Sequence, residues 1–219
     1  MTSPLPPSHQ GQLTEVQLRQ LTEKAAAGDH EALRDLLERY LPQLRAFIRL
    51  RAGAVVRARE SHSDIVQSVC RDVLQHADRF RHGSENAFKQ WLFKSALRKI
   101  INKRDYHLAV KRDVLRDRPM EPSGDGAERA SADDAALAAC YQSFSTPSQH
   151  LQAREEVQRV ERAFEELSDE HREVITLAHV VGLSRKEIAE QMGKSEGAVR
   201  VLLHRALVKI SSLLDEPPA

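Results

Sequence analysis

Apolar residues recur every three or four positions along most of the chain, the spacing that places them on one side of an α-helix. The predicted helices cover residues 14–27, 29–48, 61–80, 87–108, 150–167, 168–181, 184–192 and 195–214. Pro42 lies inside the second helix and is expected to kink it rather than end it. The pattern therefore predicts an all-α fold.

The last three predicted helices carry capping signals at each break. Gly182 ends the first of them in the left-handed backbone conformation that glycine tolerates. Ser184 and Glu187 form an S-x-x-E capping box at the start of the second. A tight break follows at Gly193, and Ser195 can cap the third helix.

The third of these helices has two unlike sides. A helical wheel gathers its apolar residues on one half, and the other half holds Gly197, Arg200, Val201, His204 and Arg205. A recognition helix in the DNA major groove needs this layout, because its N-terminal half meets base edges while its cations meet phosphates. We predict a helix-turn-helix. The alternative is an amphipathic helical hairpin whose basic side is merely solvated.

The formal net charge of +1 conceals two opposed blocks. Residues 89–118 hold ten Lys and Arg against three Asp, which gives +7. Residues 119–170 hold twelve Asp and Glu against four Arg, which gives −8. A basic segment of this density indicates a polyanionic partner such as nucleic acid.

These patterns divide the chain into four parts. We expect a disordered N-terminus (1–12), a four-helix domain (13–112), a flexible acidic linker (113–149) and the helix-turn-helix domain (150–215). The N-terminus lacks the features of a secretory signal, and no apolar run is long enough for a membrane span. We therefore expect a cytoplasmic protein without membrane contact.

Few features of the chain suggest chemistry of its own. The two cysteines lie far apart without a CxxC motif, which argues against a disulfide framework or a zinc site. The chain has no glycine-rich phosphate loop, HExxH or G-x-S-x-G motif. We expect neither an enzyme nor a cofactor.

Three stretches carry a resemblance to a known family. They read SHSDIVQSV, FKQWLFKSALRKIINKR and LSDEHREVITLAHVVGLSRKEIAEQMGKSEGAVRVLLHRAL, in that order. Their order and spacing resemble the sigma-70 family of bacterial RNA polymerase initiation factors, in particular its extracytoplasmic-function (ECF) group. The resemblance covers residues 14–214 except the linker. The sequence departs from the family at Arg98, where Asn is usual, and at Asn102, where Asp is usual, so it leaves the preferred −10 bases open.

The resemblance implies roles for three sets of residues. Docking on core RNA polymerase would involve Asp64, Ile65, Val66 and Gln67. The −10 element, where one base leaves the stack, would meet Arg98, Lys99, Asn102 and Lys103. The −35 element would meet Lys194, Ser195, Arg200, Val201, His204 and Arg205. As alternatives, Asp64 is a helix N-cap beside a solvated Gln67, and Trp91 is a core residue rather than a base-stacking one.

The function that the resemblance implies is promoter recognition and strand opening for core RNA polymerase. The partners would be the polymerase and promoter DNA, and many members of the group are also held by an anti-sigma factor. The acidic linker would thread toward the RNA exit path, or it is an ordinary tether. The alternative is a stand-alone helix-turn-helix transcription regulator whose first domain senses a ligand or partner.

Overall fold

The computed structural model describes residues 14–53, 56, 59–113, 127–145 and 152–215. This part of the chain is helical and contains no strand, so the predicted all-α class is confirmed. The elements are α1 (Glu15–Ala26), α2 (His30–Arg51), α4 (His62–Gln75), η1 (Ala77–Arg79), α5 (Glu85–Asp113), α6 (Ala127–Tyr141), α7 (Ala153–Glu165), α8 (Asp169–Ile175), η2 (Thr176–Val181), α9 (Arg185–Met192) and α10 (Glu196–Asp215). None of these helices is both long and apolar enough to cross a membrane.

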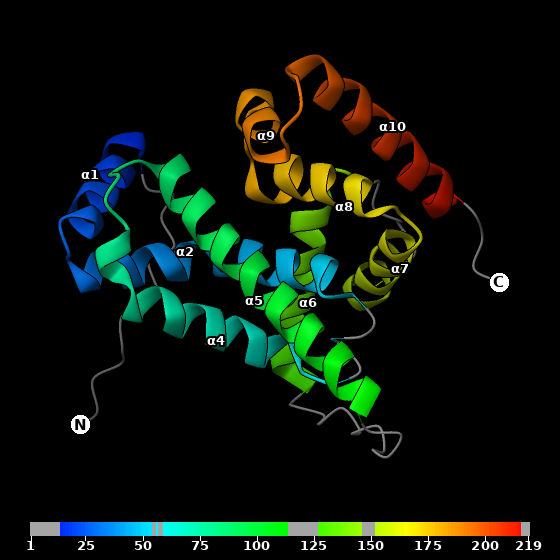
Figure 1. Ribbon diagram of the computed structural model, residues 1–219, viewed down its shortest axis with the longest axis horizontal. Coiled ribbons are helices and arrows are strands. Elements are labelled where there is room, and N and C mark those ends of the chain that lie inside the picture. The colour runs from blue at the N-terminus through cyan, green and yellow to red at the C-terminus, as the bar shows by residue number, and fades with distance from the viewer. Residues whose placement is uncertain (1–13, 54–55, 57–58, 114–126, 146–151, 216–219) are drawn as a thin grey trace, which may run out of the picture.

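Residues 14–113 form an N-terminal module of α1, α2, α4 and α5 (Figure 1). Each of its first three helices follows a cap residue whose side chain accepts a hydrogen bond from a backbone amide of the first turn. The caps are Thr14 for α1, Asp29 for α2 and Ser61 for α4. Pro42 lies inside α2 and does not end it. These caps position α4, whose exposed side was predicted to contact the polymerase.

Aromatic rings fill the core of this module. Phe88 is fully buried, and its ring centroid lies 5.6 Å from that of Tyr40 and 5.5 Å from that of Phe80. Trp91 stacks on Phe80 with 5.5 Å between ring centroids. Trp91 thus packs against the core, as predicted, but part of its surface stays exposed.

Residues 152–215 form a C-terminal module of α7 to α10. Gly182 has φ 75° and Gly193 has φ 63°, so both breaks use the left-handed conformation that was predicted for Gly182. The Ser184–Glu187 capping box is present, and the hydroxyl of Ser195 accepts from the Ala198 amide at 3.2 Å. The predicted helix-turn-helix caps are confirmed.

One feature of this module was not predicted. The helix that begins with α8 widens into a π-helical segment, η2. The Thr176 hydroxyl donates to the carbonyl oxygens of Arg172 and Glu173 at 2.8 and 3.0 Å, at the start of the widened turn. A π-helical turn closes with hydrogen bonds between residues five apart, and a helical wheel drawn for an α-helix does not reveal it.

The prediction of a flexible linker over 113–149 was wrong for part of that range. Asp113 is the last residue of α5, and α6 occupies 127–141. Leu137 and Tyr141, one helical turn apart, are buried against α2 and α7. Two large apolar residues are too few to give a periodic pattern, which is why the sequence suggested a tether. Residues 114–126 and 146–149, and the predicted disordered segment 1–12, lie outside the described residues.

We predict that Ser184→Ala lowers the free energy of unfolding of the C-terminal module by about 1 kcal/mol, because the capping box is lost. The Ser184 amide donates to Glu187 at 2.8 Å, and the Glu187 amide donates to the Ser184 hydroxyl. Chemical denaturation followed by circular dichroism measures the change. Ser212→Ala, at an exposed position of α10, is the control and should have no effect. Equal destabilisation by both substitutions would contradict the capping role.

Candidate nucleic-acid interface

The predicted −35-facing residues lie together on the solvent side of α10. Arg200, Val201, His204 and Arg205 are all exposed, with 44% of Val201 accessible. The opposite side of the helix is buried against α8 and α9. The exposed residues form a shallow hollow with the first residue of α9, Arg185. Sequence reasoning did not include Arg185, because it belongs to the preceding helix.

The segment before α10 is positioned by its own contacts. Ser195 caps the helix, so its hydroxyl is already committed to a backbone amide. The Lys194 ammonium lies 2.9 Å from the Glu170 carboxylate at the start of α8. Both residues remain beside the N-terminus of α10, where unpaired backbone amides favour an anion such as phosphate.

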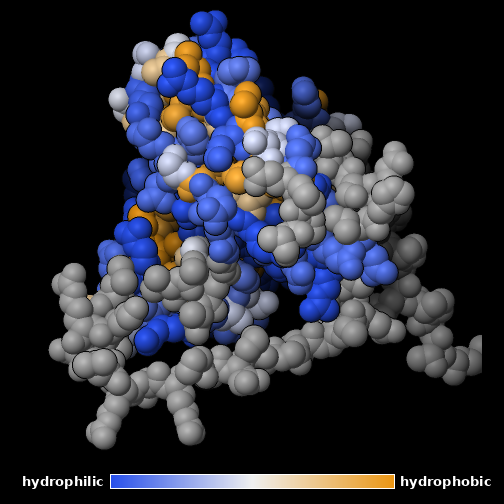
Figure 2. Space-filling model, turned by 90° about the vertical axis from the view of Figure 1, so that its right-hand side faces the viewer, coloured by the Kyte–Doolittle hydropathy of each residue, from blue (hydrophilic) through white to orange (hydrophobic). Residues whose placement is uncertain are grey.

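The C-terminal module exposes a mixed surface rather than an apolar one. In Figure 2 the coloured part of the visible face carries separate hydrophobic patches among hydrophilic residues. Val201 and Val208 are the exposed large hydrophobic residues of α10. Such a surface suits contacts with a polar, hydrated partner better than burial in a protein core.

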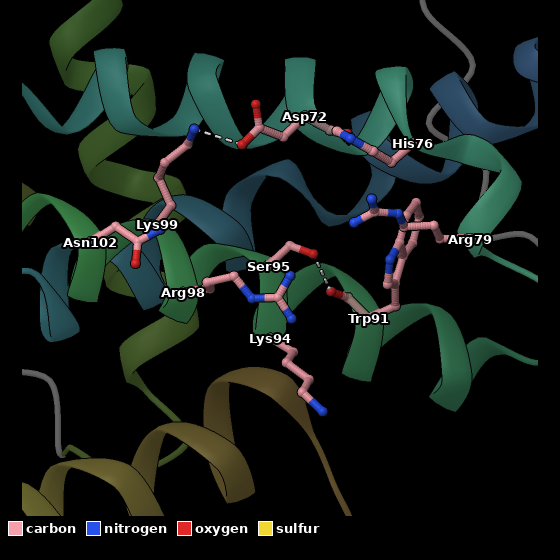
Figure 3. A pocket seen from close by; sticks show the side chains of 9 residues that line it. All are labelled: Asp72, His76, Arg79, Trp91, Lys94, Ser95, Arg98, Lys99 and Asn102. Atoms are coloured by element: carbon pink, nitrogen blue, oxygen red, sulfur yellow. Dashed lines mark hydrogen bonds and ion pairs between the residues drawn. The ribbon is translucent and has the colours of Figure 1, made fainter.

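A second candidate surface lies on the N-terminal module, in a cavity of about 340 Å³ between α4, η1 and α5 (Figure 3). Polar and charged side chains line most of it. The lining residues are Asp72, His76, Arg79, Trp91, Lys94, Ser95, Arg98, Lys99 and Asn102. The cavity therefore combines an aromatic ring, several cations and a carboxylate.

The structure separates the four predicted −10 residues. Arg98 and Asn102 are exposed and line the cavity. Lys99 also lines it, but its ammonium lies 2.6 Å from the Asp72 carboxylate. Lys103 does not line the cavity and pairs with Glu60. Among the described residues, Arg98 and Asn102 thus have no hydrogen-bond or ion-pair partner, and both are available to a ligand.

The α4 wall of the cavity presents hydrogen-bond acceptors. His76 Nδ1 lies 2.8 Å from the carbonyl oxygen of Asp72, which can only accept, so Nδ1 carries the proton. In the neutral ring Nε2 is then an acceptor. Asp72 adds a carboxylate, one oxygen of which lies 2.6 Å from the Lys99 ammonium. Sequence reasoning missed Asp72, His76 and Arg79, because no motif links α4 and η1 to the cations of α5.

The predicted docking residues divide into two pairs on α4. Ile65 and Val66 are buried and fix the helix on the core, whereas Asp64 and Gln67 are exposed. Ser61 caps the helix, and Asp64 lies in its first turn. The alternative that Asp64 is the N-cap is therefore wrong. Within the described residues its carboxylate has no hydrogen-bond or ion-pair partner.

Comparison with known proteins decides the family. The model of sigma-70 region 2 matches residues 36–107, and that of sigma-70 region 4 matches residues 157–210. The chain is 35% identical over 187 residues to the ECF RNA polymerase sigma factor SigD of Mycobacterium tuberculosis, covering 85% of this chain and 79% of SigD. It belongs to the ECF group of the sigma-70 family.

Other relatives agree with this placement. ShbA of Streptomyces griseus, also an ECF RNA polymerase sigma factor, is 27% identical and is matched over 90% of this chain and 94% of its own. The structure of CnrH in complex with the cytosolic domain of CnrY matches at 22% identity, with a TM-score of 0.53 over 90% of this chain and 96% of CnrH. That structure shows a shared fold.

The chain is thus a sigma factor, which acts in transcription initiation with core RNA polymerase and promoter DNA as partners. Region 2 falls within the N-terminal module and region 4 within the C-terminal module. The alternative of a stand-alone regulator is not supported, because region 2 accounts for most of the first module.

We predict that single-stranded DNA changes the fluorescence of Trp91, because Trp91 is the chain's single tryptophan and lines the cavity. Arg98→Ala should weaken this binding uniformly across sequences and reduce the slope of log affinity against log salt by about one, as for loss of one phosphate contact. Lys24→Ala, an exposed cation at the end of α1, is the control. A fluorescence signal insensitive to DNA would contradict the assignment of the cavity.

Proposed function

We propose that the two modules bind the two promoter elements separately, the C-terminal module the −35 element and the N-terminal module the −10 element. The observation that carries this proposal is the exposed row of Arg200, His204 and Arg205 on α10. The opposite side of the helix, with Val199, Ala206 and Ile210, is buried, so this side is the one that can meet DNA. The helix-turn-helix geometry presents such a helix to the major groove.

Individual side chains of α10 suit different contacts. Arg200 and Arg205 can each bond bidentately to a guanine edge or contact a phosphate. Val201 is apolar and exposed, as contact with a thymine methyl group requires. Lys194 and Ser195 stand beside the helix N-terminus and would contact phosphate. His204 lies between Arg200 and Arg205 along α10 and would contact a base or the DNA backbone.

The cavity of the N-terminal module suits a base that has left the stack. Extrusion costs a few kcal/mol, so a pocket and cationic contacts to the strand must offset it. Trp91 offers an aromatic surface, and Arg98 and Asn102 offer donors. Lys99 and Lys103 act indirectly in this arrangement, because Asp72 and Glu60 already hold them.

We also propose that the exposed side of α4 docks on core RNA polymerase. Asp64 presents an acceptor carboxylate and Gln67 an amide, and Ile65 and Val66 anchor the helix beneath them. A free carboxylate suits an arginine-rich surface on the partner. The chain would act in the cytoplasm and leave all bond formation to the polymerase.

The likeness to CnrH suggests one further kind of partner. CnrH was solved with the cytosolic domain of CnrY. A regulatory protein that similarly holds this chain, an anti-sigma factor, is part of the proposal. Its identity would follow from proteins that purify with the full chain in its own host.

We predict that Arg200→Ala and Arg205→Ala each weaken binding to −35 duplex DNA. Loss of a base contact should cost about 1–3 kcal/mol and relax specificity at one base pair. Arg154→Ala is the matched control, since this arginine is exposed on the same module but lies on α7. Binding to a panel of single-base variants measures both effects. Uniform weakening over the whole panel would assign that arginine to phosphate instead.

We predict that Asp64→Ala lowers the affinity for core polymerase by about tenfold or more, as expected for loss of a charged interface contact. Binding of −35 duplex DNA should not change, since Asp64 lies on the other module. Asp35→Ala, an exposed acid on α2, controls for net charge. Fluorescence titration with purified core measures the affinity. An affinity equal to that of the unaltered chain would remove the docking assignment.

A further inference from the structure

A buried threonine of α1 holds the η1–α5 loop, which consists of residues 81–84. Thr22 is fully buried, and its hydroxyl donates to the carbonyl oxygen of Gly83 at 3.0 Å. The same hydroxyl lies 2.8 Å from the carbonyl oxygen of Arg19, one turn earlier in α1. The two carbonyls share its single hydrogen. Thr22 thus links two segments that lie 61 residues apart in the sequence.

The η1–α5 loop approaches α1 closely at Gly83. A Cβ atom at this position would lie 3.0 Å from both the Cα and the Cγ atom of Glu23, a tighter contact than side chains normally make. The Cα atom belongs to the backbone of α1 and cannot turn aside as the end of a flexible side chain can. Gly83 is not among the glycines with a positive φ. The close approach, rather than the backbone conformation, therefore requires a glycine here.

The residues that follow Gly83 are held as well. The Ser84 hydroxyl accepts from a backbone amide in the first turn of α5 at 3.2 Å and so caps this helix. The Glu85 carboxylate accepts from the Tyr40 hydroxyl at 2.5 Å and pairs with the Lys89 ammonium at 2.7 Å. Three consecutive residues are therefore fixed in turn by α1, by α5 itself and by α2.

The η1–α5 loop connects two walls of the cavity that is proposed to hold a −10 base. Arg79 lines this cavity from η1, just before the loop, and Trp91 lines it from α5, after the loop. Phe80 is buried, and its ring stacks on that of Trp91 with 16° between the ring planes. Figure 3 shows Arg79 and Trp91 at the same end of the cavity. A shift of the loop would therefore change the shape of this end.

The helix α1 can act on the cavity only through such contacts. None of the described residues that line the cavity belongs to α1, which packs against η1 and α5. It also precedes residues 36–107, the part that matches sigma-70 region 2. A binding site needs its side chains held within about 0.5 Å of their productive positions, so support from a neighbouring element affects how well it binds.

We propose that Thr22 is a positioning residue for the cavity. It holds the η1–α5 loop against α1, and it thereby sets where η1 places Arg79 and Phe80 relative to Trp91. The consequence for DNA rests on the proposed binding of a −10 base in this cavity. The consequence for the surroundings of Trp91 does not, and it can be measured without DNA.

Four single substitutions in the full-length chain test this role. Thr22→Val nearly keeps the shape of the side chain but removes the hydroxyl, whereas Thr22→Ser keeps the hydroxyl. Gly83→Ala adds the Cβ atom that would meet Glu23, and so it disturbs the same contact from the other side. Thr176→Val is the matched control, because Thr176 is also fully buried and donates to backbone carbonyls, but in the C-terminal module.

The first measurement is acrylamide quenching of Trp91, the chain's single tryptophan, in the absence of DNA. Thr22→Val and Gly83→Ala should raise the quenching constant roughly 1.5-fold or more, because a loosened loop uncovers the ring face that Phe80 covers. Thr22→Ser and Thr176→Val should leave it unchanged. Circular dichroism checks that each chain is folded, and Gly83→Ala with Thr22→Ser carries the test if Thr22→Val is not. Equal quenching constants for all folded chains would overturn the proposal.

The second measurement is the affinity for a mixed-sequence single-stranded DNA oligonucleotide, followed by anisotropy of a dye on the DNA. Thr22→Val should weaken binding about fivefold, as expected for loss of one hydrogen bond, and Thr22→Ser should bind within about twofold of the unaltered chain. Binding of −35 duplex DNA should not change, which distinguishes positioning from general destabilisation. Raised quenching of Trp91 with an unaltered affinity for the oligonucleotide would overturn the positioning role.

Failure of the proposed function gives a different result. If the unaltered chain does not bind the oligonucleotide, the proposed −10 role of the cavity fails. A quenching change confined to Thr22→Val and Gly83→Ala would still support the positioning of Trp91. If Arg98→Ala weakens binding of the oligonucleotide while Thr22→Val and Gly83→Ala do not, the proposed function stands and the role of Thr22 is overturned.

Discussion

The apolar face of α10 is buried against α8 and α9, where Val199, Ala206 and Ile210 lose all contact with solvent. This burial fixes the rotation of the helix about its axis. The side with Arg200, His204 and Arg205 then faces outward, because a helix at the surface that buries its apolar side exposes its polar side. The DNA-binding surface is thus a consequence of core packing one half-turn away.

The same constraint organises the N-terminal module. Ile65 and Val66 anchor α4 in the core and leave Asp64 and Gln67 outside. Farther along this helix, Asp72 and His76 form one wall of the cavity that α5 completes. One helix therefore carries the proposed polymerase contact at its start and part of the proposed −10 site near its end. A shift of α4 on docking would reach the cavity directly.

The sequence was sufficient for features with local causes. The capping box at Ser184 and the break at Gly193 depend on a few adjacent residues, so both could be predicted before the structure. The cavity could not, since it depends on how α4 and η1 meet α5. Nor could the docking of α6, which depends on Tyr141 reaching Glu161 and on burial of Leu137. Pairing of Lys99 with Asp72 similarly needs the tertiary structure.

Mapping transcript starts with purified core polymerase tests the central claim most directly. The chain should direct initiation at defined positions on genomic DNA from its own host, downstream of two conserved elements. Exchanging one base pair in either element should reduce initiation, because each module contacts its own element. Starts that depend on one element alone, or no defined starts, would contradict the claim that two modules bind two elements.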